Sequence, residues 1–167
     1  MGSFTPSSNF EITRRDPAGN ASALLQTAAI RGTPLGASAT DPETFIPAGP
    51  TNFIGFLTRD AVVGGMTLSD RVFGRTTPTP TGLAGPFTVG DYVTVEKGME
   101  VELEGTVLLM TSGVGALVAG DAIGTNLTFI NGQVAIAQSG QNAYFTLTAN
   151  NLTSSDGTSL RIRMEKI

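Results

Sequence analysis

The feature that most constrains the fold is a series of short segments in which apolar and polar residues alternate. Residues 91–96 (DYVTVE) and 100–106 (EVELEGT) alternate in this way, and the apolar run 107–110 continues the second segment. A period of two is typical of strands, because successive side chains of a strand point to opposite faces of its sheet. Short strands with turn residues every eight to twelve residues or so are typical of small barrels and sandwiches. The sequence therefore predicts an all-β fold, a small β-barrel or β-sandwich.

A hairpin is predicted between residues 127–130 and 133–137. The two apolar runs are separated only by Asn131 and Gly132. Both of these residue types tolerate a positive φ, so Asn-Gly between two short strands is a strong local signal for a two-residue hairpin turn. The other predicted strands are residues 24–31, 52–59, 143–149 and 159–166.

The rest of the chain has the composition of an arm and loops. Residues 1–20 are polar and predict an extended N-terminal arm, followed by a single β domain over residues 21–167. Within that domain, residues 36–50 are rich in Pro and Gly and predict a loop. Alternating Thr and Pro predict a second loop near residues 75–86. Helical periodicity is weak throughout, and its best candidate, residues 20–29, fits a strand equally well.

Composition narrows the classes of function. The net charge is −4 and Lys97 and Lys166 are the only lysines, which argues against a nucleic-acid partner and against a basic membrane-binding patch. Cysteine and histidine are absent, so the chain has no disulfide, no thiolate and none of the commonest metal ligands or general bases. We expect no catalytic residues, no metal and no cofactor. Only 14% of the residues are charged, against roughly 25% in ordinary soluble domains, and such a neutral surface suits contact with other proteins.

The densest group of ionisable side chains is predicted on two strands. Glu100, Glu102 and Glu104 share one face of their strand, while Arg161 and Arg163 share one face of the last strand. If these strands are neighbours, Arg161 and Arg163 pair across to Glu102 and Glu104 on a solvated face. Two other interpretations of the three carboxylates are a glycosidase acid/base pair and a calcium site.

A long stretch of the chain is almost uncharged. From residue 105 to residue 159 the only charged residues are Asp121 and Asp156. Asp121 lies between glycines and is expected to accept backbone hydrogen bonds in a turn. The preceding glycine-rich segment, residues 111–120, lacks the lysine of a phosphate-binding loop and predicts an ordinary loop. A neutral, β-rich stretch of this length is prone to aggregation when exposed, so either subunit contacts or a large core must cover it.

Taken together, several short motifs resemble those of small β-barrel decoration proteins of tailed-phage heads. The order of the motifs carries the resemblance, which covers roughly residues 50–167. The earliest motif is FIGFLTRDAV (53–62). The others are MEVELEGTV (99–107), ALVAGDAIG (116–124), NGQVAIA (131–137), YFTLTA (144–149) and GTSLRIRM (157–164).

The resemblance implies a β-tulip-like barrel that docks on the outer surface of a phage capsid and cements neighbouring capsid subunits. Its implied partners are the major capsid protein and two further copies of itself in a homotrimer, and its implied location is the virion surface. In such proteins an N-terminal arm commonly reaches onto the shell. On that basis Phe4, Phe10, Arg14 and Arg15 are expected to contact the capsid, with the phenylalanines as anchors.

Two other classes of function compete with this hypothesis. One is a receptor- or carbohydrate-binding β-module of a virion fibre or adhesin. Such sites usually present aromatic platforms, whereas this chain has no Trp and only Tyr92 and Tyr144. The other is a hydrolase that uses the carboxylates of Glu100, Glu102 and Glu104. Alternate residues of one strand stand side by side instead of on two sides of a substrate, which argues against this class.

Overall fold

The computed structural model describes residues 10–60, 62–63, 66–67, 86–110, 113–153 and 160–167. Over these residues the protein is all-β, which confirms the predicted fold class, with a single turn of 3-10 helix. No helix in the same ranges is long and apolar enough for a membrane span. The elements are β1 (Phe10–Leu25), β2 (Pro34–Ala37), β3 (Thr44–Pro47), β4 (Phe53–Asp60), β5 (Val62–Val63), β6 (Met66–Thr67), β7 (Tyr92–Glu104), η1 (Gly105–Val107), β8 (Asn126–Ile130), β9 (Gln133–Ile136), β10 (Phe145–Thr153) and β11 (Leu160–Lys166).

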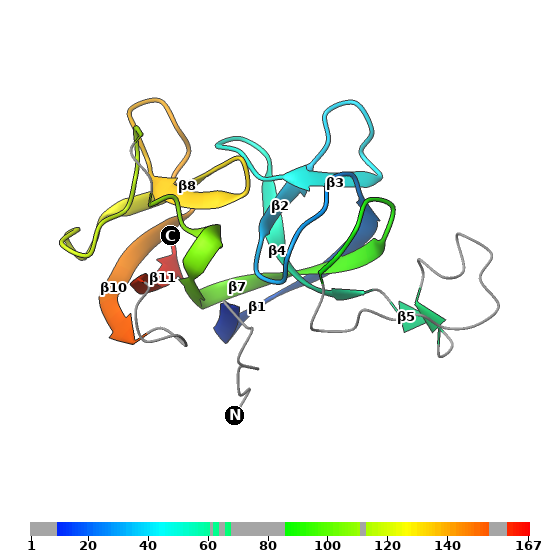
Figure 1. Ribbon diagram of the computed structural model, residues 1–167, viewed down its shortest axis with the longest axis horizontal. Helices are drawn as coiled ribbons and strands as arrows, with labels where there is room; N and C mark the ends of the chain where they lie inside the picture. The colour runs from blue at the N-terminus through cyan, green and yellow to red at the C-terminus, as the bar shows by residue number, and fades with distance from the viewer. Residues whose placement is uncertain (1–9, 61, 64–65, 68–85, 111–112, 154–159) are drawn as a thin grey trace.

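Strands β1 to β4 and the first half of β7 form a closed ring, which we call the first lobe. β1 pairs in parallel with β3, and the remaining pairs, β3–β2, β2–β4, β4–β7 and β7–β1, are antiparallel. This lobe lies on the right in Figure 1. Its buried core consists of Ala23, Leu25, Leu35, Phe45, Leu57, Phe87, Val93 and Val95.

The second half of β7 continues the sheet into β11, β10, β8 and β9, which form the second lobe. This ring returns to the chain just after β7, where Leu108 forms a parallel bridge with Val134. The N–H of Leu109 donates to the carbonyl of Val134 over 2.9 Å at the same place. The second lobe lies on the left in Figure 1. Its largest buried side chains include Phe10, Phe56, Leu103, Leu117, Leu127, Phe129, Phe145 and Leu147.

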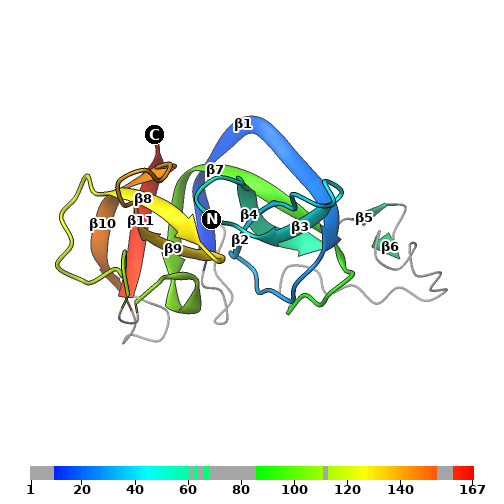
Figure 2. The same cartoon turned by 90° about the horizontal axis from the view of Figure 1, so that it is seen from above.

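The long strands β1 and β7 run through both lobes (Figure 2). Residues 92–96 of β7 pair with residues 20–24 of β1 in the first lobe. Residues 100–103 of β7 pair with residues 10–14 of β1 in the second lobe. The first ring requires both strands. The second ring requires β7, and β1 adds a further strand beside β7 in this lobe, so the two lobes share hydrogen-bonded strands.

Two sequence-based expectations are wrong in this half of the chain. Residues 10–20 do not form a free arm, because they pair with β7 and place Phe10 in the core of the second lobe. The loop expected at residues 36–50 contains all of β3, because the buried side chain of Phe45 outweighs the local Pro and Gly content. The Thr-Pro loop near residues 75–86 lies outside the described residues except for its last position.

The predicted Asn-Gly hairpin is confirmed. β8 and β9 pair antiparallel around Asn131 and Gly132, whose φ angles of 47° and 77° are those of a type I′ turn. The N–H of Gly132 donates to the carbonyl of Ala48 over 2.9 Å. The turn of the second lobe is therefore held against the first lobe.

Candidate functional site

Charged side chains line the outer face of the sheet where β1, β7 and β11 lie side by side. Val101 and Leu103 of β7 are fully buried in the second lobe. Glu100, Glu102 and Glu104 alternate with them and therefore point to the opposite face. The three glutamates thus share one face, as their spacing predicts.

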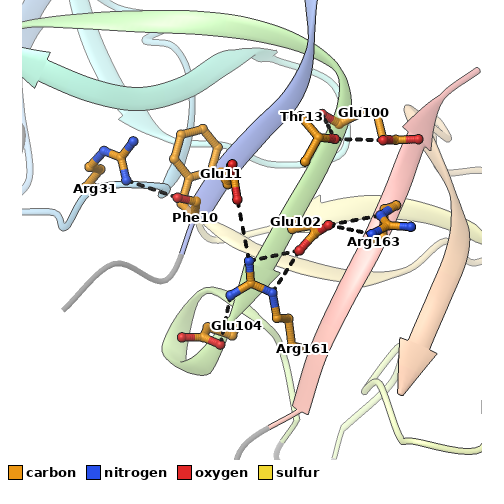
Figure 3. A network of polar contacts seen from close by, with 9 residues as sticks. All are labelled: Phe10, Glu11, Thr13, Arg31, Glu100, Glu102, Glu104, Arg161 and Arg163. Atoms are coloured by element: carbon orange, nitrogen blue, oxygen red, sulfur yellow. Dashed lines mark hydrogen bonds and ion pairs between the residues drawn. The ribbon is translucent and has the colours of Figure 1, made fainter. Parts of the chain in front are cut away.

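The two arginines of β11 reach these carboxylates (Figure 3). β11 and β7 are antiparallel neighbours, with Arg161 opposite Glu104 and Arg163 opposite Glu102. Arg161 donates from Nε to Glu102 Oε1 over 2.9 Å and from Nη1 to Glu104 Oε2 over 3.3 Å. Arg163 donates from Nη2 to Glu102 Oε2 over 2.7 Å. Oε2 of Glu11 on β1 lies 3.9 Å from Nη2 of Arg161, so three strands contribute to one ionic network.

The centre of the network is buried, whereas the alternation of the sequence suggested a solvated face. Glu104, Arg161 and Glu102 are only 5%, 8% and 9% exposed. Burial raises the pKa of Glu102, but hydrogen bonds from Arg163 and Arg161 outweigh burial and hold this pKa below its ordinary value. The hydrogen bond that Arg163 donates to Glu102 raises the pKa of Arg163 in turn.

This arrangement suits a structural role better than proton transfer. A general acid must carry a proton at working pH, and the low pKa of Glu102 keeps that carboxylate ionised. Glu100 accepts a hydrogen bond from Thr13 Oγ1 over 2.8 Å. Within the described ranges no three acidic side chains converge as metal ligands would. The ion pairs and hydrogen bonds of this network fix the register between β1, β7 and β11.

Phe10 does not have the exposed position that a capsid anchor requires. Its side chain is 1% exposed, and its ring centroid lies 5.5 Å from that of Phe56. The guanidinium of Arg31 lies 5.1 Å from the centroid of the Phe10 ring and donates to the Phe10 carbonyl over 3.0 Å. The expectation for Phe10 is therefore wrong, because a polar flanking sequence hid a strand with one apolar face. Phe4 lies outside the described residues.

The other two residues expected to contact a partner are at the surface but engaged within the chain. Arg14 Nη2 lies 2.7 Å from Glu165 Oε1, and both side chains are about half exposed. Arg15 forms an ion pair with Glu96, which Arg59 also contacts at 3.2 Å. A partner would have to compete with these pairs.

A surface that the sequence did not single out lies on the loop between η1 and β8. Four apolar side chains of this loop are exposed: Met110 by 42%, Val114 by 74%, Val118 by 58% and Ile123 by 60%. We call residues 113–125, together with Met110, the apolar loop. It projects from the side of the second lobe that is remote from the first (Figures 1 and 2).

The apolar loop is tied down at several points. Asp121 Oδ2 accepts a hydrogen bond from the Val118 N–H over 2.7 Å, which confirms the turn expected at this aspartate. The N–H of Leu117 donates to the carbonyl of Leu109 over 2.7 Å, and the Leu117 side chain is buried. Buried residues of the uncharged stretch thus supply much of the core, while four large apolar side chains of the same stretch remain in solvent.

Comparisons of the chain with protein-family models, with curated proteins and with solved structures found no match. Two features of the structure are notable: an ionic network with a buried centre that joins three strands, and a loop that presents four exposed apolar side chains and carries one charged residue, Asp121.

Proposed function

We propose that the protein is a non-enzymatic structural component of a virion that binds the outer surface of a phage capsid and cements neighbouring capsid subunits. The observation that carries the proposal is the apolar loop. Large apolar side chains that cluster in solvent on one segment commonly mark a protein–protein contact. The motifs that resemble, in their order, those of phage decoration proteins support the capsid as the partner.

The loop has the properties of a preformed contact. Its hydrogen bonds and the buried Leu117 hold it in place, so it loses little conformational entropy when it binds. Only Asp121 in this segment is charged, and its carboxylate already accepts a hydrogen bond from the backbone. Docking therefore desolvates few charges, and each buried apolar Å² contributes roughly 25 cal/mol.

The rest of the molecule suits a clamp under mechanical load. The ionic network of Arg161 and Arg163 joins β11 to β7, and β7 joins the two lobes. A trimer about a three-fold axis, as in the decoration proteins that the motifs resemble, would present three apolar loops at once. Linked sites gain affinity because the second and third contacts are intramolecular.

The test is co-sedimentation of the purified protein with expanded, undecorated shells of the major capsid protein from the same genome. We expect binding to saturate at a copy number set by the capsid lattice. The double variant Val114→Ser/Val118→Ser should bind at least tenfold more weakly. Val89→Ser is the matched control, since Val89 is 64% exposed but lies just before β7 in the first lobe.

Two results would contradict the proposal. If the shells bind no folded wild-type protein, the protein does not cement this capsid. If the wild type and the double variant bind equally, the apolar loop is not part of the contact.

A receptor- or carbohydrate-binding module is the second candidate, and one observation favours it. Tyr144 and Phe53 line a small cavity, and aromatic rings in a cavity are a common platform for sugars. Binding of the protein to a glycan array, combined with no uptake by capsid shells, would favour this second function over the first.

A further inference from the structure

A cavity of about 180 Å³ lies at the junction of the two lobes. Strands of both lobes line it: the middle of β1, the start of β4, the middle of β7 and the facing ends of β10 and β11. The lining residues used below are Asp16, Phe53, Lys97, Tyr144, Phe145 and Lys166.

The cavity is bordered by an arch in β1. Arg15 pairs with Gly98 and Asn20 pairs with Glu96, so the four residues 16–19 of β1 face only Lys97 of β7. The sequence of this segment is Asp-Pro-Ala-Gly, in which proline has no N–H to donate and Gly19 adopts a φ of 96°. Figure 2 shows β1 rising away from β7 at this point.

The charges at the cavity are unusual for this chain. Lys97 and Lys166 are its only two lysines, and both line the cavity. Lys166 Nζ lies 2.6 Å from Asp16 Oδ2, so one lysine is already paired. Among the residues that the structure describes, no acidic side chain forms an ion pair with Lys97. Two lysines and one aspartate leave this site with one excess positive charge, whereas the whole chain carries −4.

The apolar wall of the cavity is aromatic. The ring of Phe53 lies edge-on to Tyr144 at 5.3 Å and to Phe145 at 6.0 Å between centroids. Tyr144 donates its hydroxyl to the Pro50 carbonyl over 3.1 Å, which fixes its ring. Such a wall favours a flat apolar group, because aromatic rings pack edge-to-face or offset against one another.

We infer that this cavity binds a small aromatic carboxylate, with the carboxylate at Lys97 and the ring against Phe53 and Tyr144. A dry cavity of about 150 Å³ accommodates benzene, so 180 Å³ suits a single ring. Cavities for drug-sized ligands begin at roughly 300 Å³, so one ring with its carboxylate is the largest group expected inside this cavity. Two kinds of ligand carry an aromatic ring and a carboxylate of this kind: a free aromatic acid and the carboxyl-terminal phenylalanine of a partner chain.

The two lysines make the test direct. In protein labelled with ¹³C at lysine Cε, the NMR spectrum should contain two lysine Cε signals, one for each residue. Titration with benzoate should shift the Lys97 signal saturably, while benzamide, its neutral counterpart, should leave it unchanged at equal concentration. No shift with benzoate, an equal shift with benzamide, or a shift with methyl glucoside in place of benzoate would overturn the inference.

Two variants separate the site from general charge effects. Lys97→Gln should weaken benzoate binding at least tenfold, read from the Lys166 signal and from calorimetry, with an unchanged melting temperature. Arg14→Gln removes the same charge from an exposed side chain outside the cavity and should leave binding unchanged. Equal affinity of Lys97→Gln and wild type would contradict the assignment.

Two peptides then distinguish a free aromatic acid from the chain end of a partner as the ligand. Gly-Gly-Phe with a free carboxyl terminus is compared with the same peptide amidated at that terminus. Tighter binding of the free peptide than of benzoate supports a partner's chain end. Binding of benzoate alone supports a free aromatic acid as the ligand. Equal binding of the free and the amidated peptide would contradict the role of the carboxylate.

Discussion

The two lobes share two strands but are stabilised in different ways. The first lobe is a ring in which every neighbouring pair of strands is hydrogen-bonded, around a largely aliphatic core. The second lobe closes through a single bridge between Leu108 and Val134. In compensation it has a cluster of aromatic rings, in which Phe53 stacks on Phe129 with 4.2 Å between centroids. Backbone hydrogen bonds between strands thus close the first lobe, whereas the packing of aromatic side chains contributes more to the second.

The surfaces of the two lobes differ as well. The first lobe and the shared strands carry most of the charge, including the ion pairs of Glu96 and Glu102. The part of the second lobe built from residues 105–153 carries one charged residue, Asp121. This division suggests that the first lobe and the ionic network provide the scaffold, while the second lobe provides the contact surface.

The largest effect is expected from truncation in the aromatic cluster. Phe129→Ala should destabilise the protein by about 4 kcal/mol, because it removes a fully buried ring and leaves a cavity. Leu57→Ala, the corresponding change in the first lobe, should cost about 3 kcal/mol. Since β1 and β7 belong to both lobes, urea unfolding of each variant should remain a single transition. Two separate transitions would show that the lobes unfold independently.

The next effect concerns the ionic network. Glu102→Gln leaves buried Arg161 without its closest carboxylate and should lower the free energy of unfolding by about 3 kcal/mol. Glu100→Gln on the same strand is the control, because Glu100 accepts its hydrogen bond from the neutral Thr13 side chain. A cost for Glu102→Gln no larger than that of the control would assign the network no part in stability.

The same carboxylate predicts a dependence on pH. Because the pKa of Glu102 is lowered in the folded state, its contribution is fully present above its ordinary pKa of 4.5 and is lost as the pH falls through the folded value. The difference in unfolding free energy between wild type and Glu102→Gln should therefore stay constant above about pH 5.5 and shrink below pH 4.5. A difference that grows on acidification would contradict the direction of this shift.

A smaller effect is expected at the hairpin turn that holds the second lobe against the first. Gly132→Ala should cost about 1–2 kcal/mol, because alanine resists a φ of 77° and its Cβ would lie 3.0 Å from that of Pro47. Gly140→Ala has a similar φ of 85° but meets no neighbour within 4 Å, so its cost should be lower. Equal costs would mean that the contact with Pro47 contributes nothing.

The smallest effect on stability is expected on the apolar loop. Val114→Ser and Val118→Ser should each change the unfolding free energy by less than about 0.5 kcal/mol, since both side chains already lie in solvent. Thermal unfolding measures this directly. A large loss of stability would show that these side chains pack within the chain and are not free for a partner.

The sequence predicted the second lobe better than the first. The Asn131-Gly132 turn and the alternation around Glu102 and Arg163 are local signals, and the structure contains both. β3 and the first half of β1 escaped prediction because their strand character comes from distant partners. Thr44 of β3 pairs with Leu24, and Phe10 of β1 pairs with Leu103. The burial of Glu102 and Arg161 could not be predicted, since alternation separates two faces without showing what covers them.

The most direct test of the central claim is hydrogen–deuterium exchange of the protein free and bound to expanded capsid shells. We predict that binding slows exchange in residues 113–125 of the apolar loop and leaves the first-lobe loop at residues 38–43 unchanged. Protection confined to the first lobe, with no change in the apolar loop, would contradict the assignment of the second lobe as the contact surface.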